Sequence, residues 1–216
     1  MSVSKTIVIS CAGMGTRLGI GSTKALIDID GKPLIVRQLE LLKDFDDIRI
    51  VVGYQMEKVI EVVNSYRKDI LFVFNHDYRN TGTGGSFSLA IKHAAELVVS
   101  LDGDLLVHPD DLMRVLNSDK ECVCGAIPCT EDPMLMKTLT QNGQIYGVGF
   151  SREEGEYEWT GLAQVKTARL TPGDHHVCDM MVPLLPLPME LIRTKEIDTM
   201  ADYEHAVAWV KSGYAD

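Results

Sequence analysis

Apolar runs alternate with segments of helical periodicity through the first 127 residues of the chain. The runs are short and rich in β-branched residues, as is typical of strands, and they cover 5–10, 48–52, 70–74, 97–101 and 122–127. The helix-period segments between them predict helices over 34–45, 56–66, 86–95 and 109–116. Because strands and helices alternate, the sequence predicts a mostly parallel sheet with helices on both faces.

The helical rhythm stops after Pro128, and strand patterns follow. They predict a hairpin (136–139 and 146–150), a further strand (162–165) and a final helix (201–210). No repeat, linker or low-complexity segment divides the 216 residues. We therefore expect one α/β domain, in which a Rossmann-like, mostly parallel sheet flanked by helices carries a small β-rich extension.

A glycine-rich loop follows the first predicted strand. It reads Ala12-Gly13-Met14-Gly15-Thr16-Arg17-Leu18, and Lys24 comes shortly after it. A loop of low bulk can approach a polyphosphate closely, so that its N–H groups and the two cations contact the phosphate oxygens. The loop is not a Walker loop, since Gly31-Lys32 is followed by proline, nor a dinucleotide fingerprint, since Leu18 replaces the third glycine. An ordinary tight turn is the alternative interpretation of the glycines alone.

Three further segments place polar groups at the ends of predicted elements. Asp102 and Asp104 follow an apolar strand, where carboxylates suit Mg²⁺ but are also common in plain turns. A second acidic segment, Glu196-Ile197-Asp198, favours the metal interpretation. The stretch from Thr81 to Ser86 precedes a predicted helix, and we expect its backbone either to contact a base edge or to form a helix cap.

Composition and charge exclude several classes of partner. The formal net charge of −10 argues against nucleic acid or an anionic membrane, and the sequence contains neither an 18-residue apolar run nor a signal-peptide pattern. The first 37 residues nevertheless hold five basic and two acidic side chains, which suits a small anion. Five cysteines without a C-x-x-C pair favour reduced thiols and a cytoplasmic protein. The oligomeric state, a homo-oligomer included, stays open.

Several motifs in order resemble the nucleotidyltransferase superfamily that makes nucleotide-activated sugars and alcohols. They are the glycine loop with Thr23-Lys24, Gly31-Lys32-Pro33-Leu34, the acid segments that end at Asp104 and Asp198, and Trp159-Thr160-Gly161-Leu162. Residues 75–81 and 86–89 look most like the phosphocholine cytidylyltransferase branch. The resemblance implies a single domain over 1–216, with a nucleotide-binding half of about residues 1–128 and an acceptor-binding half of about residues 129–216.

The resemblance also implies roles for individual residues. Arg17 and Lys24 are expected to be catalytic, because their charge offsets the charge that builds on the leaving pyrophosphate. Asp104 and Asp198 are expected to bind the cofactor Mg²⁺. The expected nucleotide-binding residues are Ala12, Gly13, Met14, Gly15, Thr16, Thr81, Thr83, Gly84, Gly85, Ser86 and Asp102. The expected acceptor-binding residues are Lys137, Arg152, Tyr157, Trp159, Thr160, Gly161 and Glu196.

These roles predict a Mg²⁺-dependent cytidylyltransferase, with CTP favoured among nucleoside triphosphates by the resemblance alone. We expect the acceptor to be a small phosphorylated or phosphonylated alcohol, such as phosphocholine or 2-aminoethylphosphonate. Its cationic group suits Tyr157, Trp159 and the acids Glu156 and Glu158, and a core tryptophan beside solvated glutamates is the alternative interpretation of that segment. Three alternatives remain open: a sugar-1-phosphate nucleotidyltransferase, a glycosyltransferase that binds a metal through Asp102 and Asp104, and a non-catalytic nucleotide sensor. The motivation for the sensor is Phe150, near which the family commonly has a basic residue, together with a threonine before Lys24 where proline is usual.

Overall fold

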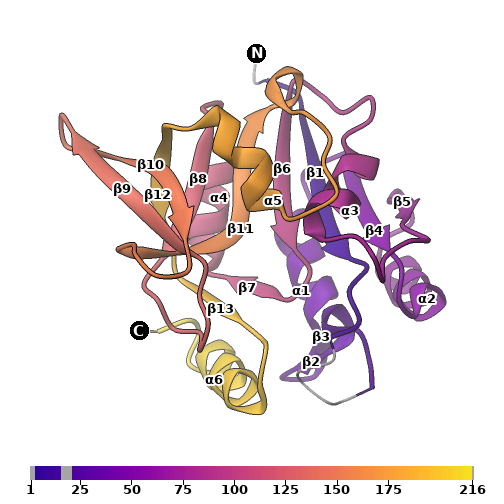
Figure 1. The fold of residues 1–216 in the computed structure, drawn as a ribbon. Helices are drawn as coiled ribbons and strands as arrows, with labels where there is room; N and C mark the ends of the chain where they lie inside the picture. The colour runs from indigo at the N-terminus through magenta and orange to yellow at the C-terminus, as the bar shows by residue number, and fades with distance from the viewer. Residues whose placement is uncertain (1–2, 16–20, 216) are drawn as a thin grey trace.

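One mixed β-sheet forms the centre of the computed structural model, which describes residues 3–15 and 21–215 (Figure 1). Its strands are β1 (Lys5–Cys11), β4 (Ile48–Val52), β5 (Leu71–Phe74), β6 (Leu97–Asp102), β8 (Cys122–Ala126), β9 (Leu135–Gln141), β10 (Gln144–Ser151), β11 (Tyr157–Lys166) and β12 (Leu187–Leu191). They lie in the order β5-β4-β1-β6-β11-β8-β12-β10-β9. Among these strands β10 and β11 run opposite to the rest, so the sheet is mostly parallel in direction, as predicted.

Two short ribbons lie outside this sheet. One pairs β2 (Asp28–Ile29) with β3 (Lys32–Pro33). The other pairs β7 (Leu105–Val107), which follows β6 directly, with β13 (Thr194–Glu196), which follows β12. The second ribbon joins two segments that are far apart in the sequence, and both carry the predicted acidic residues.

Helices cover both faces of the sheet. One face packs against α1 (Leu34–Leu41), α2 (Met56–Tyr66) and α4 (Pro109–Leu116), and the other against α3 (Thr83–Ala90) and α5 (Val177–Met181). Side chains alternate across a strand, so Ile7 and Ile9 of β1 join the first core and Val8 joins the second. The last helix, α6 (Met200–Lys211), packs against the two ribbons. The expected α/β, Rossmann-like fold is therefore confirmed.

Two helices differ from their predicted bounds for reasons of tertiary contact. The predicted helix over 34–45 ends at Leu41, because the guanidinium of Arg67 binds the carbonyls of Leu42 and Phe45 at 2.9 and 2.6 Å. The helix predicted over 86–95 begins three residues earlier, at Thr83, and ends at Ala90. Arg49 holds its end by donating to the carbonyls of residues 90, 92 and 93.

Several elements near the C-terminus do not show in the hydrophobic pattern. Helix α5 has five residues and β13 has three, which is too short for a periodic signal. Strand β12 contains Pro188, which cannot donate a ladder hydrogen bond and lowers the strand signal. No helix within the described parts of the chain is long and apolar enough to span a bilayer.

Candidate functional site

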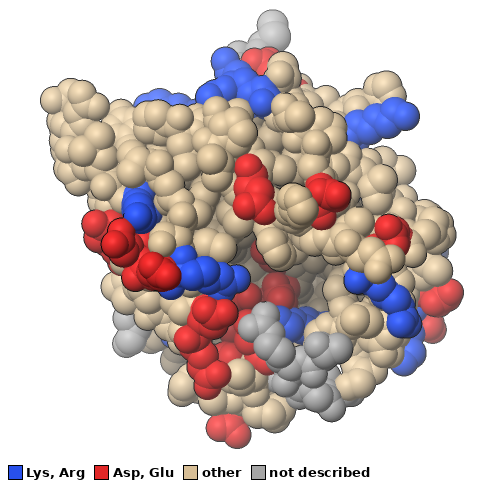
Figure 2. Space-filling model, viewed as in Figure 1, with Lys and Arg blue, Asp and Glu red and all other residues tan. Residues whose placement is uncertain are grey.

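A cavity of about 590 Å³ opens at the carboxyl ends of β1 and β6, where ligands bind in open parallel sheets. Its lining comes from the glycine loop, the start of α3, both acid segments, β11 and the loop before β9. Figure 2 shows a hollow near the centre of this face of the molecule, with acidic and basic side chains inside it. The sequence motifs therefore meet at one place.

The two acid segments come together because β7 pairs antiparallel with β13. Asp104 immediately precedes β7, and Glu196 is the last residue of β13, opposite Leu105. The pairing continues one step further, since the N–H of Ile197 donates to the carbonyl of Asp104 at 3.3 Å. As a result, carboxylate oxygens of Asp104, Glu196 and Asp198 all lie within 4.8 Å of one another. We call these three residues the acid cluster.

Lys24 contacts the acid cluster from the segment that follows the glycine loop. A single turn of 3₁₀-helix over residues 24–26 anchors its backbone, next to the buried Thr23 and Ala25. Its ammonium nitrogen lies 2.8 Å from Oδ2 of Asp104 and also contacts Oδ1 of Asp198. Burial alone lowers the pKa of Lys24, but the two carboxylates outweigh that effect and raise it above its usual range. The lysine is therefore a permanent cation among the carboxylates.

The acid cluster still carries excess negative charge. Burial, together with the charges of Asp104 and Asp198, raises the pKa of Glu196 to about 8. Three carboxylates this close to one another make a donor set of the kind that hard divalent cations take, and a lysine ammonium already stands between two of them. The residues present fit a bound divalent metal ion. Sequence reasoning had placed Glu196 with the acceptor, whereas the structure places it in the acid cluster.

Asp102 lies beside the acid cluster and is not part of it. Burial and the charge of Asp104 raise its pKa to about 7. Its backbone carbonyl accepts a 2.8 Å hydrogen bond from the buried amide of Gln38, which also binds the carbonyl of Leu105. Gly161 faces it with φ of +75°, and a Cβ there would lie 2.0 Å from Oδ2 of Asp102. Only glycine therefore allows β11 to approach this carboxylate so closely.

The glycine loop is described up to Gly15. Ala12, Gly13 and Gly15 line the cavity, whereas Met14 is 38% exposed and is not among the lining residues. The backbone of Gly15 has φ of +58°, which favours glycine. Thr16 and Arg17, predicted to bind the nucleotide and to be catalytic, lie outside the described residues.

The second glycine stretch is used partly for packing. Thr81, Thr83 and Ser86 line the cavity, but Gly84 and Gly85 do not. The N–H groups of Gly82 and Gly84 donate to the carbonyls of residues 174 and 175 at 2.8 and 3.0 Å, and a Cβ on Gly82 would lie 1.7 Å from the second carbonyl. These glycines therefore let residues 174–176 cover the start of α3, which explains why the helix begins early.

The predicted acceptor residues divide into two groups. Arg152, Trp159, Thr160 and Gly161 line the cavity, together with Glu196. Lys137 and Tyr157 are not among the lining residues, and Lys137 forms an exposed ion pair with Glu154 at 2.7 Å. The structure thus brings the β11 motif to the cavity and leaves the predicted lysine outside it.

Of the two acids that the sequence associates with a cationic acceptor, Glu158 lines the cavity and Glu156 does not. Glu158 is 5% exposed, and its carboxylate accepts from the N–H groups of Cys129 and Thr130 at 2.8 and 3.4 Å and from the Thr130 hydroxyl. Arg152 holds the same loop through the carbonyl of Asp132 at 2.6 Å. The other lining residues are Ser10, Cys11, Thr23, Ala25, Tyr78, Gly82, Gly103, Thr130, Asp132, Pro133, Met134, His176, Val177 and Cys178. They come mostly from loops, which carry no periodic signal.

Comparison with curated proteins identifies relatives over much of the chain. The bifunctional protein GlmU of Aliarcobacter butzleri is 37% identical over 155 residues, which cover 71% of this chain and 36% of that protein. GlmU of a Sulfurovum species is 31% identical over 136 residues, covering 62% of this chain and 30% of that protein. The chain therefore spans about a third of the length of these relatives.

Solved structures share the fold over almost the whole chain. The CTP:phosphocholine cytidylyltransferase of Streptococcus pneumoniae has a TM-score of 0.72 at 18% identity, covering 96% of this chain and 100% of its own. The inositol-1-phosphate CTP transferase of T. maritima has a TM-score of 0.74 at 18% identity, covering 100% and 99%. A protein of Bacillus anthracis assigned as a glucose-1-phosphate thymidylyltransferase reaches 0.76 at 18% identity, covering 96% of each chain.

The family itself is shown by a match to a family model. Residues 7–181 match the model described as MobA-like NTP transferase domain. This range includes the glycine loop, Lys24, the first acid segment and the β11 motif, which carry most of the resemblance in the sequence, whereas the second acid segment, which ends at Asp198, lies beyond it. The chain therefore belongs to the family of MobA-like NTP transferase domains.

Proposed function

We propose that this protein is a Mg²⁺-dependent nucleotidyltransferase that transfers a cytidylyl group from CTP to a small phosphorylated or phosphonylated alcohol. Phosphocholine and 2-aminoethylphosphonate are the acceptors that we favour. The observation that carries the proposal is the placement of Lys24 between Asp104 and Asp198, beside the glycine loop and at the floor of one cavity. This arrangement supports the proposal, because it gathers a cation and metal-ligating carboxylates beside a loop that suits phosphates.

The proposed reaction is a displacement at the α-phosphorus of the nucleotide. An oxygen of the acceptor phosphate or phosphonate forms the new bond to that phosphorus, and the bond to the bridging oxygen of the β-phosphate breaks, so that pyrophosphate leaves with the electron pair. The attacking oxygen is already anionic, so no side chain has to remove a proton from it. Lys24 and the loop N–H groups hold the phosphates and offset the charge on the leaving group.

The metal ion would be held by the acid cluster. When bound there, Mg²⁺ supplies positive charge that stabilises the anionic phosphates. Asp104 and Asp198 are the ligands that we favour on both sequence and geometry, and Glu196 joins them on geometry. Asp102, which adjoins the cluster, is proposed to support the nucleotide side. These assignments use residues from both halves of the chain, which suits a single domain.

CTP as donor is supported by the likeness in fold to two enzymes whose names include CTP.

The location that we propose is the cytoplasm, because all five cysteines are free thiols and four of them are buried. Neither nucleic acid nor membrane is a proposed partner, given the net charge of −10.

A sugar 1-phosphate is the alternative acceptor, and the structure gives a specific reason to retain it. The carboxylate of Glu158 already accepts hydrogen bonds from Cys129 and Thr130, and Tyr157 is not among the residues that line the cavity. Trp159 is therefore the aromatic residue of the predicted cation-binding segment that reaches the cavity. One aromatic wall suits a sugar ring by stacking as well as an ammonium group by cation–π attraction.

Pyrophosphate release tests the proposal directly. Purified protein with Mg²⁺ is incubated with CTP, UTP, dTTP or GTP and with phosphocholine, 2-aminoethylphosphonate or glucose 1-phosphate. We expect pyrophosphate with CTP and a cationic acceptor, released at a rate about two or more orders of magnitude lower when Lys24 is replaced by methionine. Release with a sugar 1-phosphate alone would move the assignment to the alternative acceptor. A glycosyltransferase or a non-catalytic sensor would release no pyrophosphate from any pair, and that result would contradict the proposal.

A further inference from the structure

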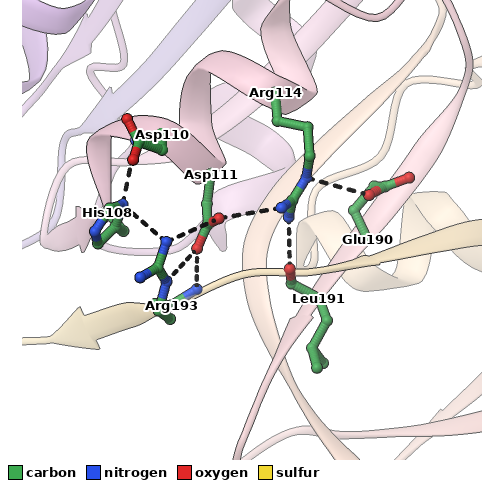
Figure 3. Close-up of polar contacts among 7 residues, drawn as sticks. All are labelled: His108, Asp110, Asp111, Arg114, Glu190, Leu191 and Arg193. Atoms are coloured by element: carbon green, nitrogen blue, oxygen red, sulfur yellow. Dashed lines mark hydrogen bonds and ion pairs between the residues drawn. The ribbon is translucent and has the colours of Figure 1, made fainter. Parts of the chain in front are cut away.

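An ion pair between the buried Asp111 and the partly exposed Arg193 lies at the end of the β7–β13 ribbon that is remote from the acid cluster. Asp111, in the first turn of α4, is 4% exposed. Its Oδ2 accepts hydrogen bonds from both the backbone N–H and the Nε of Arg193, each at 2.9 Å (Figure 3). Burial alone raises the pKa of Asp111, but the bonds from Arg193 outweigh it and hold that pKa below its usual range. The pair is therefore charged at neutral pH.

Neighbouring groups tie the same two residues to α4 and to β12. Arg114 donates to Oδ1 of Asp111 at 3.1 Å and to the carbonyl of Leu191 at 2.7 Å. His108 lies at the other side of Arg193, with its Nδ1 3.1 Å from the guanidinium and its backbone N–H donating to the carbonyl of Arg193 at 3.0 Å. Figure 3 shows Asp111 between Arg193 and Arg114, with His108 also in contact with Arg193.

The ribbon is a short ladder with this network at one end and the acid cluster at the other. Its pairs run from Arg193 with His108, through β13 with β7, to Ile197 with Asp104. Each strand of the ribbon has three residues, so few ladder bonds define how one strand is aligned with the other. A slip of one residue would turn every side chain of β13 to the opposite face and remove Glu196 from the cluster.

We propose that Asp111 and Arg193 are positioning residues for the metal site: they fix the register of β13 on β7, so that Glu196 and Asp198 face Asp104. The proposal rests on the metal site of the proposed function. Asp111 sets this register because it binds Arg193 through both its backbone and its side chain, which fixes position and direction together. At the far end of β13, Asp202 accepts from the N–H groups of Asp198 and Thr199, so the strand is held at both ends.

The test measures the binding of Mn²⁺ to the protein by electron paramagnetic resonance, with neither nucleotide nor acceptor present. In Asp111→Asn we expect the dissociation constant for Mn²⁺ to rise about three- to thirtyfold, by analogy with residues that orient metal ligands without touching the metal. Asp110→Asn is the matched control, because it removes the same charge from the neighbouring exposed position. The dissociation constant of Asp110→Asn for Mn²⁺ should stay within about twofold of the wild-type value, since long-range charge effects are screened.

A second variant guards against misfolding of Asp111→Asn. Arg193→Lys keeps the positive charge and the backbone bond to Asp111 but removes the Nε donor. It should weaken Mn²⁺ binding by an intermediate factor, in protein whose circular dichroism matches the wild type. Equal Mn²⁺ affinity in the wild type, Arg193→Lys and any folded Asp111→Asn, even with lowered melting temperatures, would show a purely structural role and overturn the inference. Absence of Mn²⁺ binding by the wild type would instead overturn the metal site itself, and this inference with it.

Discussion

Lys24 and Asp104 form an ion pair across the floor of the cavity, with 2.8 Å between the ammonium nitrogen and Oδ2. Lys24 follows the glycine loop of β1, and Asp104 follows β6, the neighbouring strand. The adjacent carboxyl ends of two parallel strands therefore bring the residues together. The lysine occupies part of the space in which the acid cluster would hold a metal ion, so we expect metal binding to move its ammonium group toward the phosphates.

Replacing Lys24 by methionine should have opposite effects on activity and on metal affinity. Turnover should fall by about two or more orders of magnitude, because the cation that offsets charge on the phosphates is lost. Binding of Mn²⁺ alone should tighten about three- to tenfold, because a competing positive charge leaves the acid cluster. Steady-state kinetics and Mn²⁺ titration measure the two effects.

Lys43→Met provides the matched control for Lys24→Met, since Lys43 is exposed and is not among the residues that line the cavity. We expect it to leave both quantities unchanged. Retained turnover in folded Lys24→Met would show that Lys24 has no part in the reaction. Weaker Mn²⁺ binding in that variant would show that the lysine supports the metal site instead of competing with the ion.

The carboxylates should differ in their effect on the Mg²⁺ requirement. Asp104→Asn and Asp198→Asn should each raise the Mg²⁺ concentration for half-maximal rate about ten- to a hundredfold, because a hard cation loses a charged ligand. Asp102→Asn should raise it much less, since Asp102 is not in the acid cluster. A titration of Mg²⁺ against rate separates the variants. The largest loss in Asp102→Asn would mean that the wrong acid of that segment has been assigned to the metal.

Glu196→Gln separates the two roles that sequence and structure suggest for Glu196. If Glu196 belongs to the acid cluster, the Mg²⁺ requirement should rise about tenfold with little change in the acceptor KM. The measurement compares both constants in one variant. A raised acceptor KM with an unchanged Mg²⁺ requirement would restore the acceptor role expected from sequence.

The limits of sequence prediction follow from where each residue gets its position. Asp104 lies at the end of a long apolar run, so its place at the carboxyl edge of the sheet could be predicted. Glu196 lies next to Asp104 because β13 pairs with β7, and neither strand is long enough to show a hydrophobic period in the sequence. Lys137 is a comparable case: its distance from the cavity depends on the register of β9 against β10 and β11. Contacts of this kind are tertiary.

The glycines show a second limit. Gly15 and Gly84 look alike in sequence, since both lie in glycine-rich stretches after strands. Gly15 lines the cavity, whereas Gly84 accommodates the carbonyls of residues 175 and 176. A glycine in the sequence indicates that a side chain at that position would clash with a neighbouring group. Only the fold shows whether that group is a ligand or another part of the chain.

Stability in acid should depend on the contact between Asp47 and Arg49. The guanidinium of Arg49, which is buried, binds both oxygens of Asp47 at 2.9 Å and the carbonyls that end α3. Burial raises the pKa of Asp47, but hydrogen bonds from Arg49 and Thr6 outweigh it and leave the pKa below its usual value. The folded pKa is thus lower than the unfolded one, so the ionised carboxylate stabilises the fold above the unfolded pKa, and this contribution is lost as pH falls through the folded value.

Asp47→Asn should therefore lower the free energy of unfolding at pH 7 by about 1 kcal/mol, a modest value because Asp47 is partly exposed. The difference from the wild type should shrink below about pH 4, where the wild-type carboxylate begins to be protonated. Urea unfolding at several pH values measures it. Asp46→Asn, at the exposed neighbouring position, is the control. A difference that stays constant down to about pH 2 would contradict the linkage.

The nature of the acceptor should show in variants of Trp159. Trp159 lines the cavity and packs edge-on against Phe150, with ring centroids 5.2 Å apart. If the indole binds an ammonium group, Trp159→Leu should raise the KM for phosphocholine about three- to thirtyfold and leave the nucleotide KM nearly unchanged, because cation–π attraction of about 0.5–2 kcal/mol is lost.

Phe150→Leu is the matched control for Trp159→Leu, since Phe150 shares the same packing without lining the cavity. The KM values for phosphocholine, 2-aminoethylphosphonate and a neutral sugar 1-phosphate are measured in each protein. A cationic acceptor predicts that the loss is confined to the first two substrates. Equal wild-type use of all three, or an equal loss for all three in Trp159→Leu, would assign stacking and shape, not charge, to Trp159.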